Sequence, residues 1–297
     1  VQRQDRAQSR IDMLKVDPAT GTSEILFTEN AARPDYWINL SDNYRFLKDG
    51  SLLWWSERSG YGQFYRLDTG EWTQLTEGTQ PVVSLVGVNE EEGSFFFTRV
   101  DDVLTTQVYR ADLSGEGEPE RLTDPDYTNS ASMDGKGRAL LVSRSKPDQP
   151  PQSYLAGREG QRITWIEENA LDAEHPYTPY LKPDMEPGRK YPVFYYHYSG
   201  PGPQLVDKGW TGALAQAVVD RGYIWFALDN RGSANRGVDF EQPIYRAMGG
   251  VEVRDQKTGA EFLKTLDYVD GDKIAFYGWS YGGHMTLKQL QADPGLY

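Results

Sequence analysis

The chain has 297 residues, no cysteine and a formal net charge of −13 at pH 7. The lack of cysteine excludes disulfide scaffolds, thiolate metal sites and thiol catalysis, and the acidic balance argues against nucleic acid as a partner. No apolar run is long enough to span a membrane, so we expect a soluble protein, periplasmic or secreted rather than cytoplasmic. Because the first residue is Val1 and not methionine, we also expect the chain to begin inside a longer protein.

The first part of the chain repeats itself. Three Gln-x-Tyr segments occur at intervals of 44 and 45 residues, and an apolar strand with a turn glycine before it precedes each one. A partial copy opens the chain at residues 11–17. This spacing is typical of β-propeller blades, so we expect the C-terminal blades of a propeller over residues 1–175, with an antiparallel sandwich as the alternative. The repeated tyrosines are Tyr65, Tyr109 and Tyr154, and the pair Leu75-Thr76 recurs as Leu122-Thr123.

The second part of the chain alternates strands with helices. A proline-rich stretch at residues 175–190 marks the boundary. The alternation after it is typical of a doubly wound parallel sheet. On the first helix we expect Leu214, Ala217 and Val218 to form the buried face, and on the second we expect Phe262, Leu263 and Leu266 to be the apolar anchors. Strands are predicted at residues 192–198, 223–228 and 274–277, and helices at residues 210–221, 251–266 and 283–291.

The stretch around Ser280 predicts a nucleophile elbow, in which a strand, a sharp turn and a helix follow one another. Gly278 and Gly282 provide the small side chains that a strained serine needs on both sides, and we expect Gly283 to relieve crowding between helix and sheet. Backbone N–H groups at the helix N-terminus favour an oxyanion. We therefore expect a nucleophilic serine in the N-terminal part of an α/β-hydrolase domain over residues 176–297. An incidental glycine-rich turn is the alternative.

Two loops follow the other predicted strands and belong to the same rim of the sheet. The phenol of Tyr198 is positioned to donate a hydrogen bond to an oxyanion, the alternative being a tyrosine packed on the sheet. Arg231 follows the second strand and either braces its loop or contacts substrate.

Together these motifs resemble the dipeptidyl peptidase IV branch of the prolyl oligopeptidase family of serine peptidases, and the propeller segment is similar to that of bacterial members. The similarity covers nearly the whole chain. The matching text is Gly278-Trp279-Ser280-Tyr281-Gly282-Gly283, Tyr196-His197-Tyr198-Ser199-Gly200-Pro201 and Asp229-Asn230-Arg231-Gly232-Ser233.

The resemblance implies an activity and a set of site residues. The family releases dipeptides from free peptide N-termini and prefers proline or alanine in the second position. By resemblance, Ser280 is the nucleophile, and the Tyr198 hydroxyl and the Tyr281 N–H are the oxyanion donors. The Tyr281 ring forms a wall of the proline pocket, and Trp279 and Arg231 are further candidate substrate contacts. We expect no cofactor or metal, and the family suggests a homodimer for the full-length protein.

The sequence departs from the family pattern in its catalytic base. The hydrolase triad runs in the order Ser, Asp, His. Only 17 residues follow Ser280, and they contain Asp293 and one poorly placed histidine, His284. His175 lies in the linker, and His197 points to the opposite face of its strand from Tyr198. We therefore expect the triad Asp and His downstream of this chain and little activity from the chain alone.

Two further departures concern substrate binding and the sheet. The family's amine-binding glutamates belong to earlier propeller sequence, so this role is not carried over to Glu167 and Glu168, which we expect in an exposed turn. Strands usual in the family are missing between Leu181 and Lys182. Two other functions stay open: an acylaminoacyl peptidase or oligopeptidase of the same fold, and a non-catalytic propeller scaffold or pseudo-hydrolase.

Overall fold

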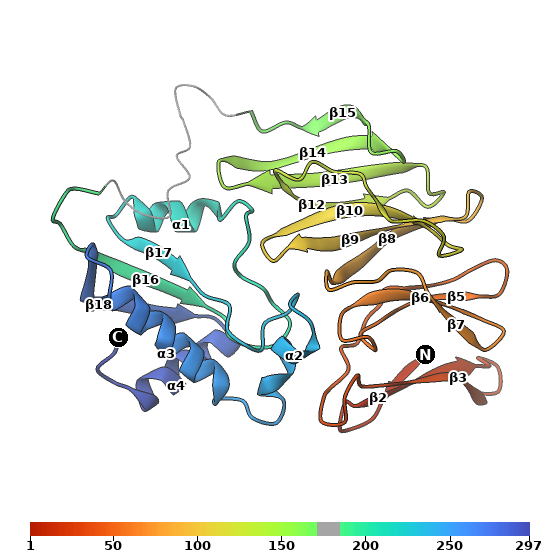
Figure 1. The fold of residues 1–297 in the computed structure, drawn as a ribbon, viewed down its shortest axis with the longest axis horizontal. Coiled ribbons are helices and arrows are strands. Elements are labelled where there is room, and N and C mark those ends of the chain that lie inside the picture. Colours follow the sequence, from red (N-terminus) through yellow and green to blue (C-terminus); the bar gives the residue numbers. More distant parts are fainter. Residues whose placement is uncertain (171–184) are drawn as a thin grey trace.

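The computed structural model describes residues 1–170 and 185–297. A row of antiparallel sheets comes from the first part of the chain, and a parallel sheet with helices from the second part lies beside it (Figure 1). The predicted domain boundary at residue 175, His175 and the junction between Leu181 and Lys182 lie outside the described residues.

Four antiparallel sheets follow one another along residues 2–167, and the strands of each sheet are consecutive in the chain. The first sheet has three strands and the other three have four. Small up-and-down sheets at a constant interval are propeller blades. The strands are β1 (Gln2–Gln4), β2 (Arg10–Val16), β3 (Ser23–Asn30), β4 (Tyr44–Phe46), β5 (Leu52–Ser56), β6 (Gln63–Asp68), β7 (Glu71–Gln74), β8 (Val82–Asn89), β9 (Ser94–Asp102), β10 (Thr105–Asp112), β11 (Glu120–Arg121), β12 (Thr128–Met133), β13 (Ala139–Lys146), β14 (Gln149–Gly157) and β15 (Arg162–Glu167).

The repeated glutamine has the same function in each four-stranded blade. Gln63 begins β6, and its amide nitrogen donates to carbonyls in the loop after β7 while its oxygen accepts from Thr76 Oγ1 at 2.6 Å. Gln107 makes the equivalent bond with Thr123 Oγ1 at 2.8 Å and also donates to the following loop. Gln152 donates to the chain after β15. The repeated glutamine therefore links the third strand of each four-stranded blade to the loop that follows its last strand by hydrogen bonds.

Adjacent blades pack through buried apolar side chains on facing strands. The rings of Phe64 and Phe95, from neighbouring blades, are 5.4 Å apart at their centroids. Each pair of neighbouring blades therefore shares its own cluster of buried apolar side chains. The blade cores contain Met13, Leu52, Trp54, Leu53, Phe64, Val82, Phe95, Phe97, Tyr109, Phe96, Leu140, Val142 and Tyr154.

The second part forms a three-stranded parallel sheet in the order β17-β16-β18. The carboxyl ends of parallel strands lie at one edge, so the loops after β16, β17 and β18 meet there. Helix α3 packs its buried Ala260 and Leu263 on the sheet core formed by Tyr191, Val193 and Tyr195. The elements are β16 (Tyr191–His197), α1 (Gly212–Val219), β17 (Ile224–Ala227), α2 (Val238–Glu241), η1 (Gln242–Ile244), α3 (Val251–Lys264), β18 (Val269–Gly278) and α4 (Tyr281–Ala292).

The predicted helices are present, but two of their predicted buried positions are wrong. In α1 the buried residues are Ala215 and Val219, whereas Leu214 is 62% exposed. In α3, Leu263 is buried and Phe262 is 54% exposed. Apolar residues occur around most of α1, so its sequence does not distinguish one face from another.

Candidate active site

Ser280 lies in the sharp turn between β18 and α4. Its backbone has φ 55° and ψ −114°, a conformation that costs energy for a residue with a side chain. The backbone leaves no room for larger neighbours: a Cβ on Gly278 would be 2.6 Å from the Gly282 Cα, and one on Gly282 would be 2.7 Å from the His197 carbonyl oxygen. The turn therefore requires glycine at both positions, as a nucleophile elbow does.

Gly283 is not constrained in this way. A Cβ at this position would meet nothing closer than the Gly278 carbonyl oxygen at 3.7 Å, an ordinary van der Waals distance. The expectation that Gly283 relieves crowding between helix and sheet is therefore wrong. The helix already begins at Tyr281, two residues earlier than predicted, so Gly283 lies inside the first turn of α4.

The elbow presents Ser280 at the surface beside free donors. The Ser280 side chain is exposed, and no hydrogen bond of its hydroxyl is found within the described residues. Tyr281 is the first residue of α4, where backbone N–H groups have no partner within the helix. A negatively charged oxygen bound beside Ser280 would find this N–H and the positive end of the helix dipole.

The loop after β16 brings Tyr198 to the same edge of the sheet. Ser199 has a φ of 69°, and its carbonyl accepts a hydrogen bond of 3.0 Å from Asn230 Nδ2 in the loop after β17. Gly200 lies against Tyr281, since a Cβ there would be 2.6 Å from the Tyr281 ring. The rings of Tyr198 and Tyr281 are 6.0 Å apart. The structure thus brings Ser280, Tyr198 and Tyr281 together from the ends of two adjacent strands.

The two described histidines differ sharply in environment. His197 is fully buried, stacks on Phe276 with a centroid distance of 3.7 Å, and lies 3.1 Å from both Ser199 Oγ and Thr286 Oγ1. Burial lowers the pKa of His197 to about 4, so the ring is neutral near pH 7. His284 is exposed on α4, with its ring 5.4 Å from the Tyr281 ring. Neither imidazole is hydrogen-bonded to Ser280 in the described part of the chain.

Arg231 and Trp279 lie at the rim but make different contacts. The Arg231 guanidinium binds the Asp255 carboxylate of α3 through two nitrogens, at 2.6 and 3.0 Å, and the Arg231 N–H donates to the same group at 3.0 Å. Trp279 is 76% exposed beside Ser280. Glu167 and Glu168 are exposed at the end of the last blade, as expected.

Two side chains of this site were not predicted from the sequence. Asn230 joins the two rim loops, as described above. Glu252 is fully buried near the start of α3, and its Oε1 accepts a hydrogen bond of 2.9 Å from the Tyr281 hydroxyl. The position of Glu252, in the first turn of a helix and two residues after Gly250, indicates a helix cap. It does not indicate Tyr281 as a hydrogen-bond partner.

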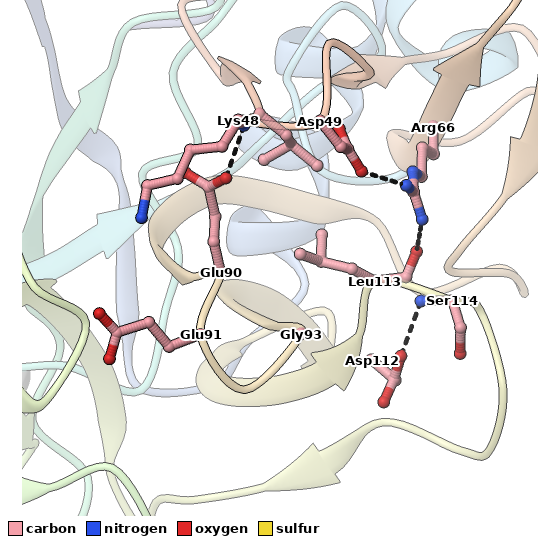
Figure 2. Close-up of a pocket in the computed structure, with 10 residues that line it drawn as sticks. Lys48, Asp49, Arg66, Glu90, Glu91, Gly93, Asp112, Leu113 and Ser114 are labelled. Atoms are coloured by element: carbon pink, nitrogen blue, oxygen red, sulfur yellow. Dashed lines mark hydrogen bonds and ion pairs between the residues drawn. The ribbon is translucent and has the colours of Figure 1, made fainter.

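One cavity lies next to the rim, and another lies away from it. One of about 400 Å³ is lined by Trp37, Leu40, Gly202 and Tyr245, and so lies between the blades and the loop that carries Tyr198. A second, of about 380 Å³, lies away from the site, among turns of the second and third blades (Figure 2). Arg66 contacts Asp49 Oδ2 at 2.6 Å, whereas Glu90 and Asp112 accept hydrogen bonds from backbone N–H groups.

Neither a metal site nor a membrane-spanning helix is found in the described residues. No group of three His, Cys, Asp or Glu side chains there is arranged to hold a metal ion. Likewise, none of the helices in residues 1–170 and 185–297 is long and apolar enough to cross a membrane.

Known proteins match the chain over both of its parts. Residues 1–151 match the family described as the dipeptidyl peptidase IV N-terminal region, and residues 210–297 match the prolyl oligopeptidase family. Dipeptidyl peptidase 4 of Trichophyton tonsurans is 26% identical over 99% of this chain and 42% of its own length. Dipeptidyl peptidase 8 of Mus musculus is 25% identical over 99% of this chain and 40% of its own length.

The fold also matches a solved structure. The crystal structure of Porphyromonas gingivalis dipeptidyl peptidase 4 superposes with a TM-score of 0.90 at 25% identity, over 100% of this chain and 45% of that one. The architecture is therefore that of propeller blades followed by an α/β-hydrolase sheet, and the chain spans less than half the length of these relatives. The chain belongs to the dipeptidyl peptidase IV branch of the prolyl oligopeptidase family.

Proposed function

We propose that this chain is part of a serine exopeptidase that releases N-terminal X-Pro or X-Ala dipeptides through an acyl-enzyme on Ser280. The observation that carries the proposal is the strained backbone of Ser280 at the N-terminus of α4, between two glycines that cannot be replaced without a clash. A serine is held in this costly conformation when its hydroxyl must be presented for attack. The names of the relatives support the dipeptidyl specificity.

In the proposed mechanism, Ser280 Oγ attacks the carbonyl carbon of the second residue and loses its proton to a general base. The carbonyl oxygen becomes an oxyanion, which accepts hydrogen bonds from the Tyr198 hydroxyl and the Tyr281 N–H. The amide nitrogen leaves with the proton, and water then hydrolyses the ester on Ser280. We propose that the Tyr281 ring and Trp279 contact the substrate side chain, and that Arg231 braces the rim through Asp255.

We propose that the Asp and His of the triad come from sequence that follows this chain in the full-length protein. His197 is unsuited to the role, because it is fully buried, its ring contacts Ser199 and Thr286 rather than Ser280, and its lowered pKa of about 4 makes it a weak proton acceptor near pH 7. The relatives are more than twice as long as this chain, which leaves ample sequence for the missing groups. A division into residues 1–175 and 176–297, peptides with free N-termini as substrates, and a homodimer of the full-length protein belong to the same proposal.

The experiment compares two amides, a Gly-Pro chromogenic amide and its N-acetylated form, in the full-length protein and in the 297-residue chain. We expect the full-length protein to cleave a Gly-Pro chromogenic amide, to cleave its N-acetylated form at least about a hundredfold more slowly, and to lose activity in the Ser280→Ala variant. The chain alone should be nearly inactive. Faster cleavage of the N-acetylated amide would identify an acylaminoacyl peptidase or oligopeptidase instead. If the full-length protein neither cleaves an amide nor reacts with a fluorophosphonate, the scaffold alternative is correct.

A further inference from the structure

Glu252 is a buried carboxylate that connects α3 to the first residue of α4. Its side chain has no exposed surface. Its Oε1 accepts the Tyr281 hydroxyl at 2.9 Å and also the Gly249 N–H, and its Oε2 accepts the Gly250 N–H at 3.0 Å. A single carboxylate therefore holds both the backbone before α3 and the side chain that begins α4.

The charge of Glu252 is balanced by hydrogen bonds rather than by a cation. None of the ion pairs found in the described residues involves this carboxylate, although a buried carboxylate needs compensation. Two backbone N–H groups, the Tyr281 hydroxyl and the N-terminus of α3 supply it. Removing any of these donors leaves a buried oxygen of Glu252 with one hydrogen bond fewer, which costs free energy. This cost favours the orientation in which the Tyr281 hydroxyl donates to Glu252.

The Tyr281 ring is confined on its other sides as well. Gly200 lies directly against it, and the rings of Tyr198 and His284 have centroids 6.0 and 5.4 Å away. Burial, together with the Glu252 carboxylate, raises the pKa of the Tyr281 phenol above its ordinary range, so the hydroxyl is protonated and able to donate near neutral pH. The ring is thereby fixed at one end by Glu252 and along its face by the rim loop.

We propose that Glu252 is a positioning residue that sets specificity, because it holds the Tyr281 ring in place as a wall of the pocket for the second substrate residue. The inference rests on the proposed function, in which Tyr281 contacts substrate through its ring and the oxyanion through its N–H. A proline ring fills the pocket and packs on this wall, whereas an alanine methyl contacts it less. If the Tyr281 ring can move, we therefore expect kcat/KM to fall more for proline than for alanine substrates.

The structural alternative is that Glu252 only caps α3. Its two bonds to the backbone before the helix are those of a cap, and a cap contributes to stability wherever it occurs. The two roles differ in whether the effect of Glu252 passes through the Tyr281 hydroxyl. A double-mutant cycle measures this difference directly.

The first experiment measures urea unfolding of the 297-residue chain for Glu252→Gln, Tyr281→Phe and the double variant. We expect Glu252→Gln to change the unfolding equilibrium constant about tenfold less in the Tyr281→Phe background than in the wild type, because the hydroxyl is then already absent. Equal effects in the two backgrounds would show that Glu252 only caps the helix and would overturn the proposal. This result does not depend on any peptidase activity.

The second experiment measures the ratio of kcat/KM for Gly-Pro and Gly-Ala amides in the full-length enzyme. We expect Glu252→Gln to lower this ratio about fivefold or more, and to have no further effect on it in the Tyr281→Phe background. A ratio unchanged by Glu252→Gln would overturn the specificity role. Failure of the wild type to cleave either amide would instead overturn the proposed function, while the unfolding cycle still decides whether Glu252 holds Tyr281.

Gln289→Met is the matched control. Gln289 is fully buried in α4 and donates to the Val253 carbonyl of α3 at 2.7 Å, so it joins the same two helices without touching Tyr281. We expect this variant to lower stability and to leave the Gly-Pro to Gly-Ala ratio unchanged. A ratio that falls in Gln289→Met as much as in Glu252→Gln would mean that the loosened helices, and not the hydroxyl contact, alter the pocket, and would overturn the proposal.

Discussion

At the scale of single residues, the strain at Ser280 and the lack of space beside it are two parts of one feature. The positive φ of Ser280 turns the chain so tightly that Gly278 and Gly282 contact each other's backbone and the carbonyl of His197. Only glycine fits at these two positions. The close packing around the turn therefore holds Ser280 in its strained backbone conformation.

This packing predicts opposite outcomes for two neighbouring glycines. Gly278→Ala would put a Cβ 2.6 Å from backbone atoms, so we expect it to lower the free energy of unfolding by about 3 kcal/mol. Gly283→Ala meets only an ordinary contact at 3.7 Å and lies inside α4, so we expect it to raise stability by about 0.5–1 kcal/mol. Urea unfolding of the two variants measures both values, and a similar loss in each would contradict the account of the turn.

Sequence reasoning identified residues whose role depends on local pattern and missed those whose role depends on the fold. Alternation along β16 places His197 on the same face as the buried Val193 and Tyr195, because strand geometry alone decides it. Its orientation relative to Tyr198, which follows the end of β16, stays a prediction. Glu252 and Tyr281 are separated by 29 positions and meet only when α3 and α4 pack together. Their hydrogen bond leaves no trace in the local pattern of either segment.

At the scale of elements, the repeat predicted the blades better than composition predicted the helix faces. The interval of 44 to 45 residues reflects a structural requirement, because a buried glutamine must satisfy its amide in each four-stranded blade. The burial of α1 depends instead on which side of a short, mostly apolar segment meets the sheet. With Gln216 as its one polar side chain, α1 offers little such information, and Leu214 was wrongly placed for this reason.

The hydrogen bonds of the repeated glutamines lead to a prediction for Gln107. Its side chain is fully buried, and its oxygen accepts from Thr123 Oγ1 at 2.8 Å and from Asn129 Nδ2 at 2.9 Å. Gln107→Leu keeps the volume and removes these partners, so we expect a loss of about 2–3 kcal/mol in the free energy of unfolding. The exposed Gln74→Leu serves as the control, with a change below about 0.5 kcal/mol. Equal effects in thermal or urea unfolding would show that the buried amide bonds are not what the repeat preserves.

At the scale of the whole molecule, the blades and the α/β sheet are joined by contacts that no sequence pattern indicates. Asn39, in the segment between β3 and β4, donates one amide group to two carboxylates: Glu57 Oε2 at 3.0 Å and Glu241 Oε2 at 2.9 Å. Beside it, the Trp37 N–H donates to Gln242 Oε1 at 2.8 Å. Partners some 200 positions apart meet here, so the interface could not be read from the chain.

The two carboxylates at this interface are costly to ionise together. Glu241 is buried and Glu57 half-buried, and no cation contacts either one among the described residues. Burial, and then the charge of Glu241, raise the pKa of Glu57 to about 7, and burial also raises the pKa of Glu241. Within the folded protein, one proton therefore remains on the pair well above the ordinary glutamate value of 4.5.

The raised pKa of Glu57 determines the direction in which stability changes with pH. Between about pH 4.5 and pH 7 the folded protein binds more protons at Glu57 than the unfolded chain does, so the free energy of unfolding falls as pH rises through this range. Glu57→Gln replaces the titrating acid by a neutral amide, so no second negative charge forms beside Glu241 as pH rises. We therefore expect the variant to match the wild type near pH 5 and to exceed it at pH 7.5, as measured by urea midpoints. Glu91→Gln, in the exposed turn after β8, should keep the wild-type pH dependence. If the midpoint of Glu57→Gln changes with pH in the same way as the wild-type midpoint, the raised pKa of Glu57 does not contribute to the pH dependence of stability.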